Sequence, residues 1–336
     1  MPVSAAVPDL SFAVVGAGAV GSVIGWRLAR AEASLLMVGR GPHLQAMQRD
    51  GLRLTDGQVD ARLPVRCCTD TRGEAPHDVV FVATKAQDIE SALDGAAALI
   101  GQHTVVIAAV NGLPWWYFQG VARGDAGALH AVDPEGRLFQ RFAPRQLIGA
   151  VVHIGASLPG PGHVAQTGGH GLILGELDNA VTERARAIAQ VLDCGGLPTQ
   201  VSTSIRDDIW SKLVGNISTN PLSVVTGATL DRLFNEPSLR RLVTAVMLET
   251  MTVGAGYGVR FALDPAQRID LGRRLGAFRT SMLQDFDRGR PLELGAIVDA
   301  VLELAERIGV PMPMTTLVRD LADVAQRSAR LLQETT

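Results

Sequence analysis

The fold is indicated by residues 10–21, LSFAVVGAGAVG, in which a short apolar run meets a glycine-rich turn. The apolar run predicts a buried strand that ends at Val15, and a helical pattern follows the turn as far as Ala31. Residues 34–38, SLLMV, then predict a second strand. A strand, a helix and a second strand in this order predict a βαβ unit with parallel strands.

The glycines of the turn have three separate physical tasks. Gly16 permits the tight turn, Gly18 lets a pyrophosphate approach the backbone, and Gly21 allows the helix to pack closely on the strand. The helix that follows presents free N–H groups and the positive end of its dipole to phosphates. We therefore predict that this turn binds a dinucleotide through Gly16, Ala17, Gly18, Ala19, Val20 and Gly21.

The end of the second strand predicts which dinucleotide is bound. An NAD site would place Asp or Glu here to bond the ribose 2′-hydroxyl, whereas this sequence has Gly39 and Arg40. A guanidinium forms paired, charge-assisted bonds with a 2′-phosphate. Arg40 therefore predicts NADP (NADPH) as the cofactor, and the alternative is a solvated surface arginine.

Alternation of strands and helices continues beyond this unit. Strands are predicted over residues 78–83 and 104–110, with a helix over 87–100 between them. Strands flanked by helices imply a parallel sheet covered on both faces. After a less regular stretch, strand patterns over residues 147–154 and 171–174 and a helix over 180–192 follow. We predict residues 1–200 as an NADP-binding domain of the Rossmann type, with an insertion around residues 114–145.

The second part of the chain lacks strand patterns. Helical spacing of apolar residues runs over 240–254, 265–287 and 292–308, and Pro313 precedes a last helix. We predict residues 201–336 as an all-helical domain for substrate binding and dimerisation. The fold class is thus α/β, with a doubly wound sheet followed by an all-α domain.

Composition narrows the class of function. The chain has 336 residues, of which 47% are hydrophobic and 19% charged, and its formal charge is −3. This balance fits a globular enzyme with a small-molecule substrate and argues against nucleic-acid or membrane-surface binding. Three cysteines without a CxxC pair and seven histidines without metal-ligand spacing predict a cytoplasmic protein with no metal site. His153 is interpreted as structural or close to the cofactor.

Polar residues at predicted element ends and on one helix face are candidate site residues. Lys85 and Asn111 follow strands at their carboxyl ends, where open parallel sheets gather ligand contacts. Lys212, Asn216 and Asn220 lie four residues apart and therefore share one face of a helix. Hydride addition to a ketone builds negative charge on oxygen, which a nearby ammonium stabilises and then protonates.

Together with Ser281 and Glu293, these residues give the chain a pattern that resembles the ketopantoate reductases over nearly its whole length. The resemblance implies a C-terminal domain like that of 6-phosphogluconate dehydrogenase and NADPH-dependent reduction of 2-dehydropantoate to (R)-pantoate in pantothenate biosynthesis. It also implies a homodimer as the family-level expectation. The implied roles are proton donation by Lys212, substrate binding by Asn111, Asn216, Asn220 and Ser281, and cofactor binding by Arg40, Lys85, Asn111 and Glu293.

Two positions depart from the family pattern and leave the substrate open. Phe278 and Leu230 stand where the family has asparagines, which favours a more apolar substrate pocket. The aromatic run from Trp115 to Phe118 is either local core or a substrate-facing segment. Alternatives to ketopantoate reduction are therefore a reductase for another 2-oxo acid, in reverse a D-2-hydroxyacid dehydrogenase, and a non-catalytic NADP-binding sensor.

Overall fold

The computed structural model of this protein describes residues 8–121 and 127–334, which form two compact units. Unit 1 contains residues 8–110, 118–121 and 138–205, and unit 2 contains residues 111–117, 127–137 and 206–334. The first unit therefore continues slightly past the boundary expected at residue 200. Residues 111–117 and 127–137, expected within or beside an insertion of the first domain, belong to unit 2.

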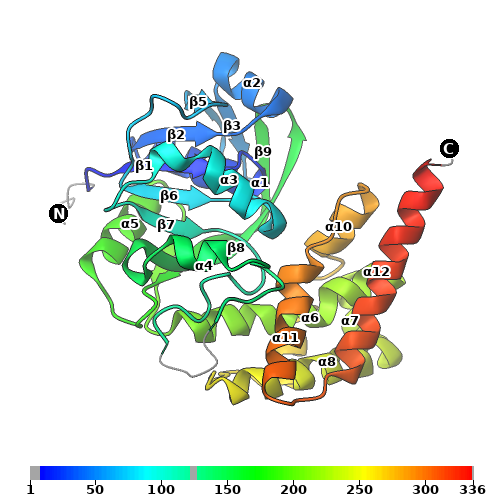
Figure 1. Cartoon of the computed structure of the whole chain (residues 1–336). Coiled ribbons are helices and arrows are strands. Elements are labelled where there is room, and N and C mark those ends of the chain that lie inside the picture. The colour runs from blue at the N-terminus through cyan, green and yellow to red at the C-terminus, as the bar shows by residue number, and fades with distance from the viewer. Residues whose placement is uncertain (1–7, 122–126, 335–336) are drawn as a thin grey trace, which may run out of the picture. The chain divides into compact units, whose positions relative to one another are not determined.

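Unit 1 is built on a ten-stranded mixed sheet in the described part of the chain, with strands in the order β4-β3-β9-β8-β7-β6-β1-β2-β5 and β10 paired to β9 (Figure 1). Its centre is parallel, since β1 lies between β2 and β6 and runs parallel to both. The strands are β1 Ser11–Val15, β2 Ser34–Val38, β3 Leu52–Thr55, β4 Asp60–Leu63, β5 Arg66–Cys68, β6 Val79–Val82, β7 Val105–Ala108, β8 Leu147–Gly160, β9 His163–Gly175 and β10 Thr199–Val201.

Apolar strands in the middle of this sheet are buried on both faces, as β-branched runs between two helical layers require. Every residue of β6 is buried, as is every residue of β1 after its first. Alternate residues of a strand share one face, so Phe12 and Val14 join the same core cluster as Phe81, together with apolar residues of α1 (Ala19–Arg30) and α5 (Glu183–Cys194). The predicted parallel α/β core is therefore present.

Three departures from the expected elements of unit 1 have local causes. The helix expected over residues 87–100 is divided into η1 (Ala86–Asp88), α3 (Ile89–Gly95) and η2 (Ala97–Leu99). Strands β3 to β5 were not predicted because they are short and only half-buried, without a long apolar run. Strands β8 and β9 extend beyond the predicted residues into a long antiparallel hairpin with register shifts. The other helical segments are α2 Gly41–Asp50, α4 Arg137–Arg141 and η3 Pro144–Gln146.

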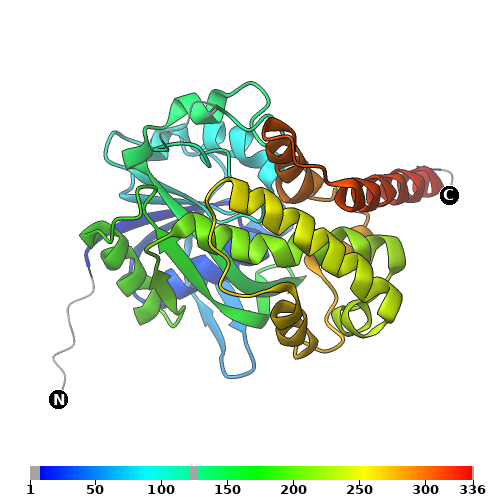
Figure 2. The ribbon, with the colours of Figure 1, turned by 90° about the horizontal axis from the view of Figure 1, so that it is seen from below.

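From residue 206 to residue 334, unit 2 contains helices and no strand, and Figure 2 shows the last of them, α12, running to the C-terminal end of the chain. The continuous helix expected over residues 265–287 is wrong, because Gly276 takes a left-handed φ of 65° and Thr280 caps a new helix by accepting a bond from Leu283 N–H. The helix expected over residues 292–308 begins with a π-helical turn. The elements are α6 Ile205–Thr226, α7 Leu230–Asn235, α8 Pro237–Gly256, α9 Pro265–Arg273, α10 Ser281–Asp287, η4 Gly295–Asp299, α11 Ala300–Arg307 and α12 Pro313–Glu334.

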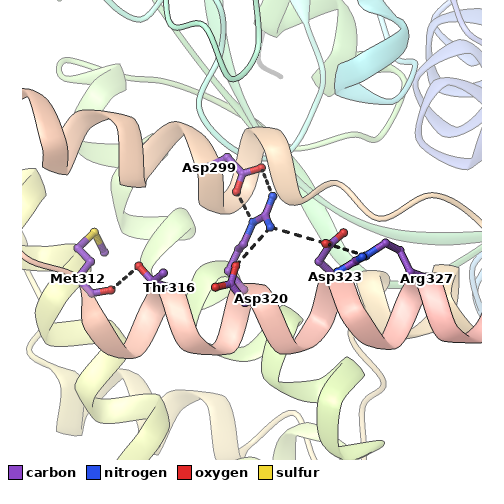
Figure 3. A network of polar contacts seen from close by, with 7 residues as sticks. Asp299, Met312, Thr316, Asp320, Asp323 and Arg327 are labelled. Atoms are coloured by element: carbon purple, nitrogen blue, oxygen red, sulfur yellow. Dashed lines mark hydrogen bonds and ion pairs between the residues drawn. The ribbon is translucent and has the colours of Figure 1, made fainter.

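Charged side chains fix α12 within unit 2. Glu249 of α8 accepts hydrogen bonds from the N–H groups of Met314 and Thr315 at the start of α12, where the helix has unpaired donors. Further along, Arg319 donates to Asp299 of η4 at 2.8 Å (Figure 3). The helix is thus held at its first turn and again along the face that carries Arg319.

Candidate active site

The glycine-rich turn of unit 1 has the geometry of a phosphate-binding loop. Gly16 takes a φ of 105°, and a Cβ there would lie 2.8 Å from the carbonyl of Ala83. A Cβ on Gly21 would lie 2.0 Å from the carbonyl oxygen of Gly16, so α1 can pack on the turn only with glycine at this position. A Cβ on Gly18, in contrast, would meet nothing closer than 3.9 Å. The middle glycine therefore keeps open the space that a pyrophosphate needs at the N-terminus of α1.

Residues at the ends of β2 and β6 adjoin this loop. Gly39 lies against it, since a Cβ there would come within 2.9 Å of the Cβ of Ala17, and exposed Arg40 follows as the N-cap of α2. On the other side, Thr84 lies close to Gly16, and its Oγ1 is buried without a hydrogen-bond partner among the described residues. Lys85 comes next in the chain and is half-buried.

These features fit a dinucleotide with a 2′-phosphate. The open cradle at Gly18 and the unpaired hydroxyl of Thr84 suit the pyrophosphate, which brings many acceptor oxygens. Arg40 and Lys85 supply cationic donors on the same unit. The roles of individual residues toward the cofactor stay predictions.

In unit 2, Lys212 of α6 is joined to Asn111. The ammonium donates to Asn111 Oδ1 at 2.7 Å, across 101 positions of sequence. Desolvation by burial lowers the pKa of Lys212 to about 8, and the charge of Glu293 acts in the opposite direction. An amine with this pKa remains largely protonated near neutral pH and still gives up its proton readily, which is the property required of a general acid.

Glu293 therefore belongs to the surroundings of the lysine. Its side chain is buried in unit 2, two residues before η4. A buried carboxylate near an ammonium stabilises the charged form of that ammonium. The structure therefore indicates an electrostatic effect of Glu293 on Lys212. The cofactor-binding role that the sequence predicted for Glu293 stays a prediction.

The two asparagines of the predicted set follow Lys212 on α6, each one turn further along. Asn216 is half-buried and Asn220 is buried, and the Nδ2 donor of Asn220 has no hydrogen-bond partner in the described structure. A buried amide without a partner costs free energy unless something else accepts its bond. Asn220 thus has a buried donor that is not used within the described structure, and its role toward the substrate stays a prediction.

Two buried hydroxyls that the sequence analysis did not single out connect Asn220 to the predicted serine. Ser223 donates to the backbone oxygen of Asn220 at 2.6 Å and bonds the hydroxyl of Thr280 at 2.7 Å. Thr280 is the N-cap of α10, whose first residue is Ser281. Ser281 is exposed, and this chain of bonds holds its helix against α6. The spacing of Ser223 after Asn220 is one helical turn, but a lone serine there carries no distinctive signal in the sequence.

The segment that begins with Asn111 is held at both ends. Gly112 takes a φ of 87° and approaches η4 so closely that a Cβ would lie 2.3 Å from the carbonyl oxygen of Ala296, which accepts a bond from Leu113 N–H. At the other end, Trp210 Nε1 donates to the hydroxyl of Tyr117 at 2.8 Å. Helix α6 therefore holds this segment through Trp210 and, half a turn further on, through Lys212.

The aromatic run is buried, which supports the local-core alternative. Trp115, Trp116, Tyr117 and Phe118 each expose 3% or less of their surface. The Arg206 guanidinium lies 6.0 Å from the ring centre of Trp116 and 5.8 Å from that of Tyr117, and its Nε donates to the backbone oxygen of Tyr117. Trp115, Trp116 and Tyr117 belong to unit 2 together with Arg206 of α6, and Phe118 belongs to unit 1.

The two departures from the family pattern are close to each other in unit 2. The N–H of Leu230, at the start of α7, donates to the backbone oxygen of Phe278 at 2.9 Å. Leu230 is buried, whereas the Phe278 ring is partly exposed three residues before Ser281. The sequence did not indicate that these positions would be paired.

No group of three or more His, Cys, Asp or Glu side chains among the described residues is arranged to hold a metal ion. His153 is exposed on β8, and all three cysteines are free thiols. None of the helices in residues 8–121 and 127–334 is both long and apolar enough to cross a bilayer.

A Rossmann-type unit followed by a helical unit with a half-buried, low-pKa lysine defines a class of dinucleotide-dependent oxidoreductases. Two family models match this chain. Residues 12–179 match the ketopantoate reductase PanE/ApbA family, and residues 204–326 match its C-terminal domain. The chain belongs to the ketopantoate reductase PanE/ApbA family.

Individual relatives agree with this assignment. A 2-dehydropantoate 2-reductase from Mesorhizobium japonicum is 39% identical over 319 residues, which cover 93% of this chain and 98% of the relative. The crystal structure of a proposed ketopantoate reductase from Ralstonia solanacearum MolK2 is 40% identical, with a TM-score of 0.90 and coverage of 96% and 99%. A D-mandelate dehydrogenase solved with NADH and anilino(oxo)acetate shares the fold, with a TM-score of 0.82 at 22% identity and coverage of 96% and 99%.

Proposed function

We propose that this enzyme reduces 2-dehydropantoate to (R)-pantoate with NADPH, and that Lys212 donates the proton. The observation that carries the proposal is the bond between the Lys212 ammonium and Asn111, on a half-buried lysine whose pKa is about 8. The open phosphate cradle at Gly18 and the cationic Arg40 at the end of β2 support NADPH as the cofactor. The relative from Mesorhizobium japonicum, a 2-dehydropantoate 2-reductase, supports the choice of substrate.

The residues of unit 2 perform the acid chemistry of the reaction. NADPH, when bound, supplies the hydride that adds to the ketone carbon. The Lys212 ammonium stabilises the negative charge that develops on the ketone oxygen and transfers a proton from Nζ to that oxygen. Asn111 orients the ammonium before the reaction, and the charge of Glu293 raises the pKa of the lysine. The unpaired Nδ2 of Asn220 provides a donor for a substrate oxygen.

Steady-state kinetics with NADPH and NADH test this assignment. The wild-type enzyme should oxidise NADPH in the presence of 2-dehydropantoate, and Lys212→Ala should reduce kcat by about 100-fold or more while NADPH still binds, since general acid catalysis contributes this much. Ser211→Ala, one residue earlier on the same helix, serves as the matched control. Turnover that is unchanged in Lys212→Ala would refute Lys212 as the proton donor, whereas NADPH binding without measurable turnover in the wild-type protein would support the non-catalytic sensor.

A second candidate function keeps the fold and the proton donor but changes the substrate. This candidate is supported by the backbone bond between Leu230 and Phe278, two apolar residues at positions where the resemblance implies asparagines. An apolar subsite favours a 2-oxo acid with an apolar or aromatic side chain over a hydroxylated one. A panel of ketopantoate, pyruvate, 2-oxoisovalerate and phenylglyoxylate separates the candidates, and Phe278→Asn should shift preference toward ketopantoate if Phe278 selects the substrate.

We further propose that the enzyme is a cytoplasmic homodimer. The three cysteines are unpaired, as is usual in a reducing compartment. A ketopantoate reductase from Staphylococcus aureus with the same fold is described as dimeric. Sedimentation velocity of the purified enzyme would determine its oligomeric state, and a monomer at micromolar concentration would contradict the dimer.

A further inference from the structure

The last helix of the chain, α12, has one broad apolar face, of which unit 2 covers only a part. Its inner face packs within unit 2, where Val318 and Ala322 are buried. Arg319 follows Val318 in the chain and bonds Asp299 of η4. At 100° per residue, these three positions fall within about 100° of helix circumference, which is the width of an ordinary core-facing stripe.

The exposed edge of this apolar face carries a further stripe. Leu317, Leu321 and Val324 expose 52%, 45% and 49% of their surface, and the spacing continues through Ser328 to Leu331. These five positions, which we name the outer stripe, are separated by 4, 3, 4 and 3 residues. That interval is the heptad spacing of a helix that pairs with another helix along a seam.

The outer stripe adjoins the inner face on one side. Relative to Val318, the positions of Leu321, Leu317 and Val324 are rotated by about 60°, 100° and 120° around the helix, on the side away from Ala322 and Arg319. Isolated exposed leucines are common, but an aligned series on one helix marks a contact surface. Figure 2 shows the C-terminal part of α12 extending beyond the other helices of unit 2.

We propose that the outer stripe pairs with the same stripe of a second copy of this chain, with the two α12 helices antiparallel. The charges beside the stripe favour this occupant. Asp320 and Arg327 flank the stripe on one side, seven residues apart. In an antiparallel pair, a twofold axis brings Asp320 of one copy against Arg327 of the other, twice in the same interface.

Other arrangements lose this complementarity. A parallel pair would set Asp320 and Arg327 beside Ala325 and Leu332, without opposite charges. Both residues already contact charged neighbours on their own helix, Asp320 with Arg319 and Arg327 with Asp323. The partner would therefore join an existing row of alternating charges, which sets orientation more than affinity.

The antiparallel arrangement fixes a register. Leu321 of one helix packs opposite Val324 of the other, and Leu317 packs opposite Ser328. The proposal rests on the proposed homodimer and adds to it the surface and the orientation of the contact. Its tests measure mass and cross-linking without substrate, so they stand or fall separately from the kinetic test of 2-dehydropantoate reduction.

Sedimentation velocity across a dilution series tests the surface. The wild-type protein should sediment as a species of about 71 kDa, twice the 35.6 kDa of the chain. The dimer of the double variant Leu321→Glu with Val324→Glu should have a dissociation constant about 100-fold higher than that of the wild-type dimer. The reason is that each carboxylate would have to be desolvated against an apolar partner. Leu275→Glu, at a leucine 63% exposed outside α12, is the matched control and should remain dimeric.

Far-UV circular dichroism and NADPH binding show whether each variant is folded. A wild-type monomer, or a dimer that persists in a folded Leu321→Glu, Val324→Glu variant, would overturn the proposal. If that variant fails to fold, disulfide cross-linking decides the question without disturbing the stripe.

Cross-linking tests the orientation in a background where Cys194, the exposed native cysteine, is replaced by Ser. The antiparallel register predicts that Leu317→Cys combined with Ser328→Cys forms a covalent dimer under mild oxidation. Either substitution alone should give little covalent dimer, because each cysteine then faces a serine or a leucine of the partner helix. Equal cross-linking by Leu317→Cys alone would indicate a parallel pair and overturn the proposed orientation, and no cross-linking in any variant would overturn the interface.

Discussion

The pH dependence of reduction follows from the position of Lys212 and offers the sharpest test of its role. A proton donor must be protonated, so activity is lost as the pH rises through the pKa of the ammonium, which burial lowers to about 8. With that pKa, about 90% of the lysine is protonated at pH 7 and about 10% at pH 9, from the titration curve of a single group. The kcat/KM for reduction should therefore fall about tenfold between these pH values.

The assay is the initial rate of NADPH oxidation at low ketone substrate, from pH 7 to pH 10. Since kcat/KM reports groups of the free enzyme, its inflection can be compared directly with the lysine pKa. The 2′-phosphate of NADPH titrates near pH 6, below the range used. In the oxidative direction the same lysine acts as base, so the rate should rise with pH through the same inflection.

Two variants decide whether the inflection belongs to Lys212. Glu293→Gln removes the charge that raises the lysine pKa, so its inflection should move to lower pH. Lys212→Arg stays cationic throughout and should lose the inflection together with most of the activity. A wild-type profile that is flat to pH 10, or an inflection that survives in Lys212→Arg, would refute the assignment of Lys212 as proton donor.

Three further substitutions test the cofactor site and the buried network. Arg40→Ala should weaken NADPH binding by roughly 10- to 100-fold and leave NADH nearly unaffected, the range of a charged hydrogen bond, as measured by fluorescence titration with both cofactors. Gly21→Ala should abolish NADPH binding in the same titration, because its Cβ would lie 2.0 Å from the oxygen of Gly16, and retained affinity would contradict the described turn. Ser223→Ala removes the bond to Thr280 and should lower the free energy of unfolding, measured in urea, by about 1–2 kcal/mol. It should also raise the KM for the substrate. If Ser223 has a purely structural role, stability should fall while KM stays unchanged.

The parallel core of unit 1 could be predicted from sequence because its strands are continuous apolar runs. Residues 34–38 were predicted as a strand with the bounds of β2, and the glycines at 16, 18 and 21 indicated their separate tasks. Each of these signals is local, so the physical constraint is visible in a few neighbouring residues. The same holds for Lys212, Asn216 and Asn220, whose interval of four residues is a property of α6 itself.

What could not be predicted depends on contacts between distant residues. Strands β3 and β5 are too short to show a period, and they exist because neighbouring strands pair with them. The bond from Lys212 to Asn111 spans 101 positions, and no local pattern records it. Ser223 was missed for the same reason, since its importance comes from Thr280, which is 57 residues away.

The π-helical turn η4 has a consequence for how this site could be gained or lost in evolution. A π turn holds one residue more than an α-helical turn, and a single-codon insertion is the simplest way to create one. Deleting one codon within residues 295–299 would restore regular α-helical geometry. The residues just before η4 would then be rotated by about 100° relative to α11. Glu293 would then leave the neighbourhood of Lys212, and the carbonyl of Ala296 would turn away from Leu113. A three-base deletion outside every predicted catalytic position could thus silence the enzyme, while α11 and α12 remain folded.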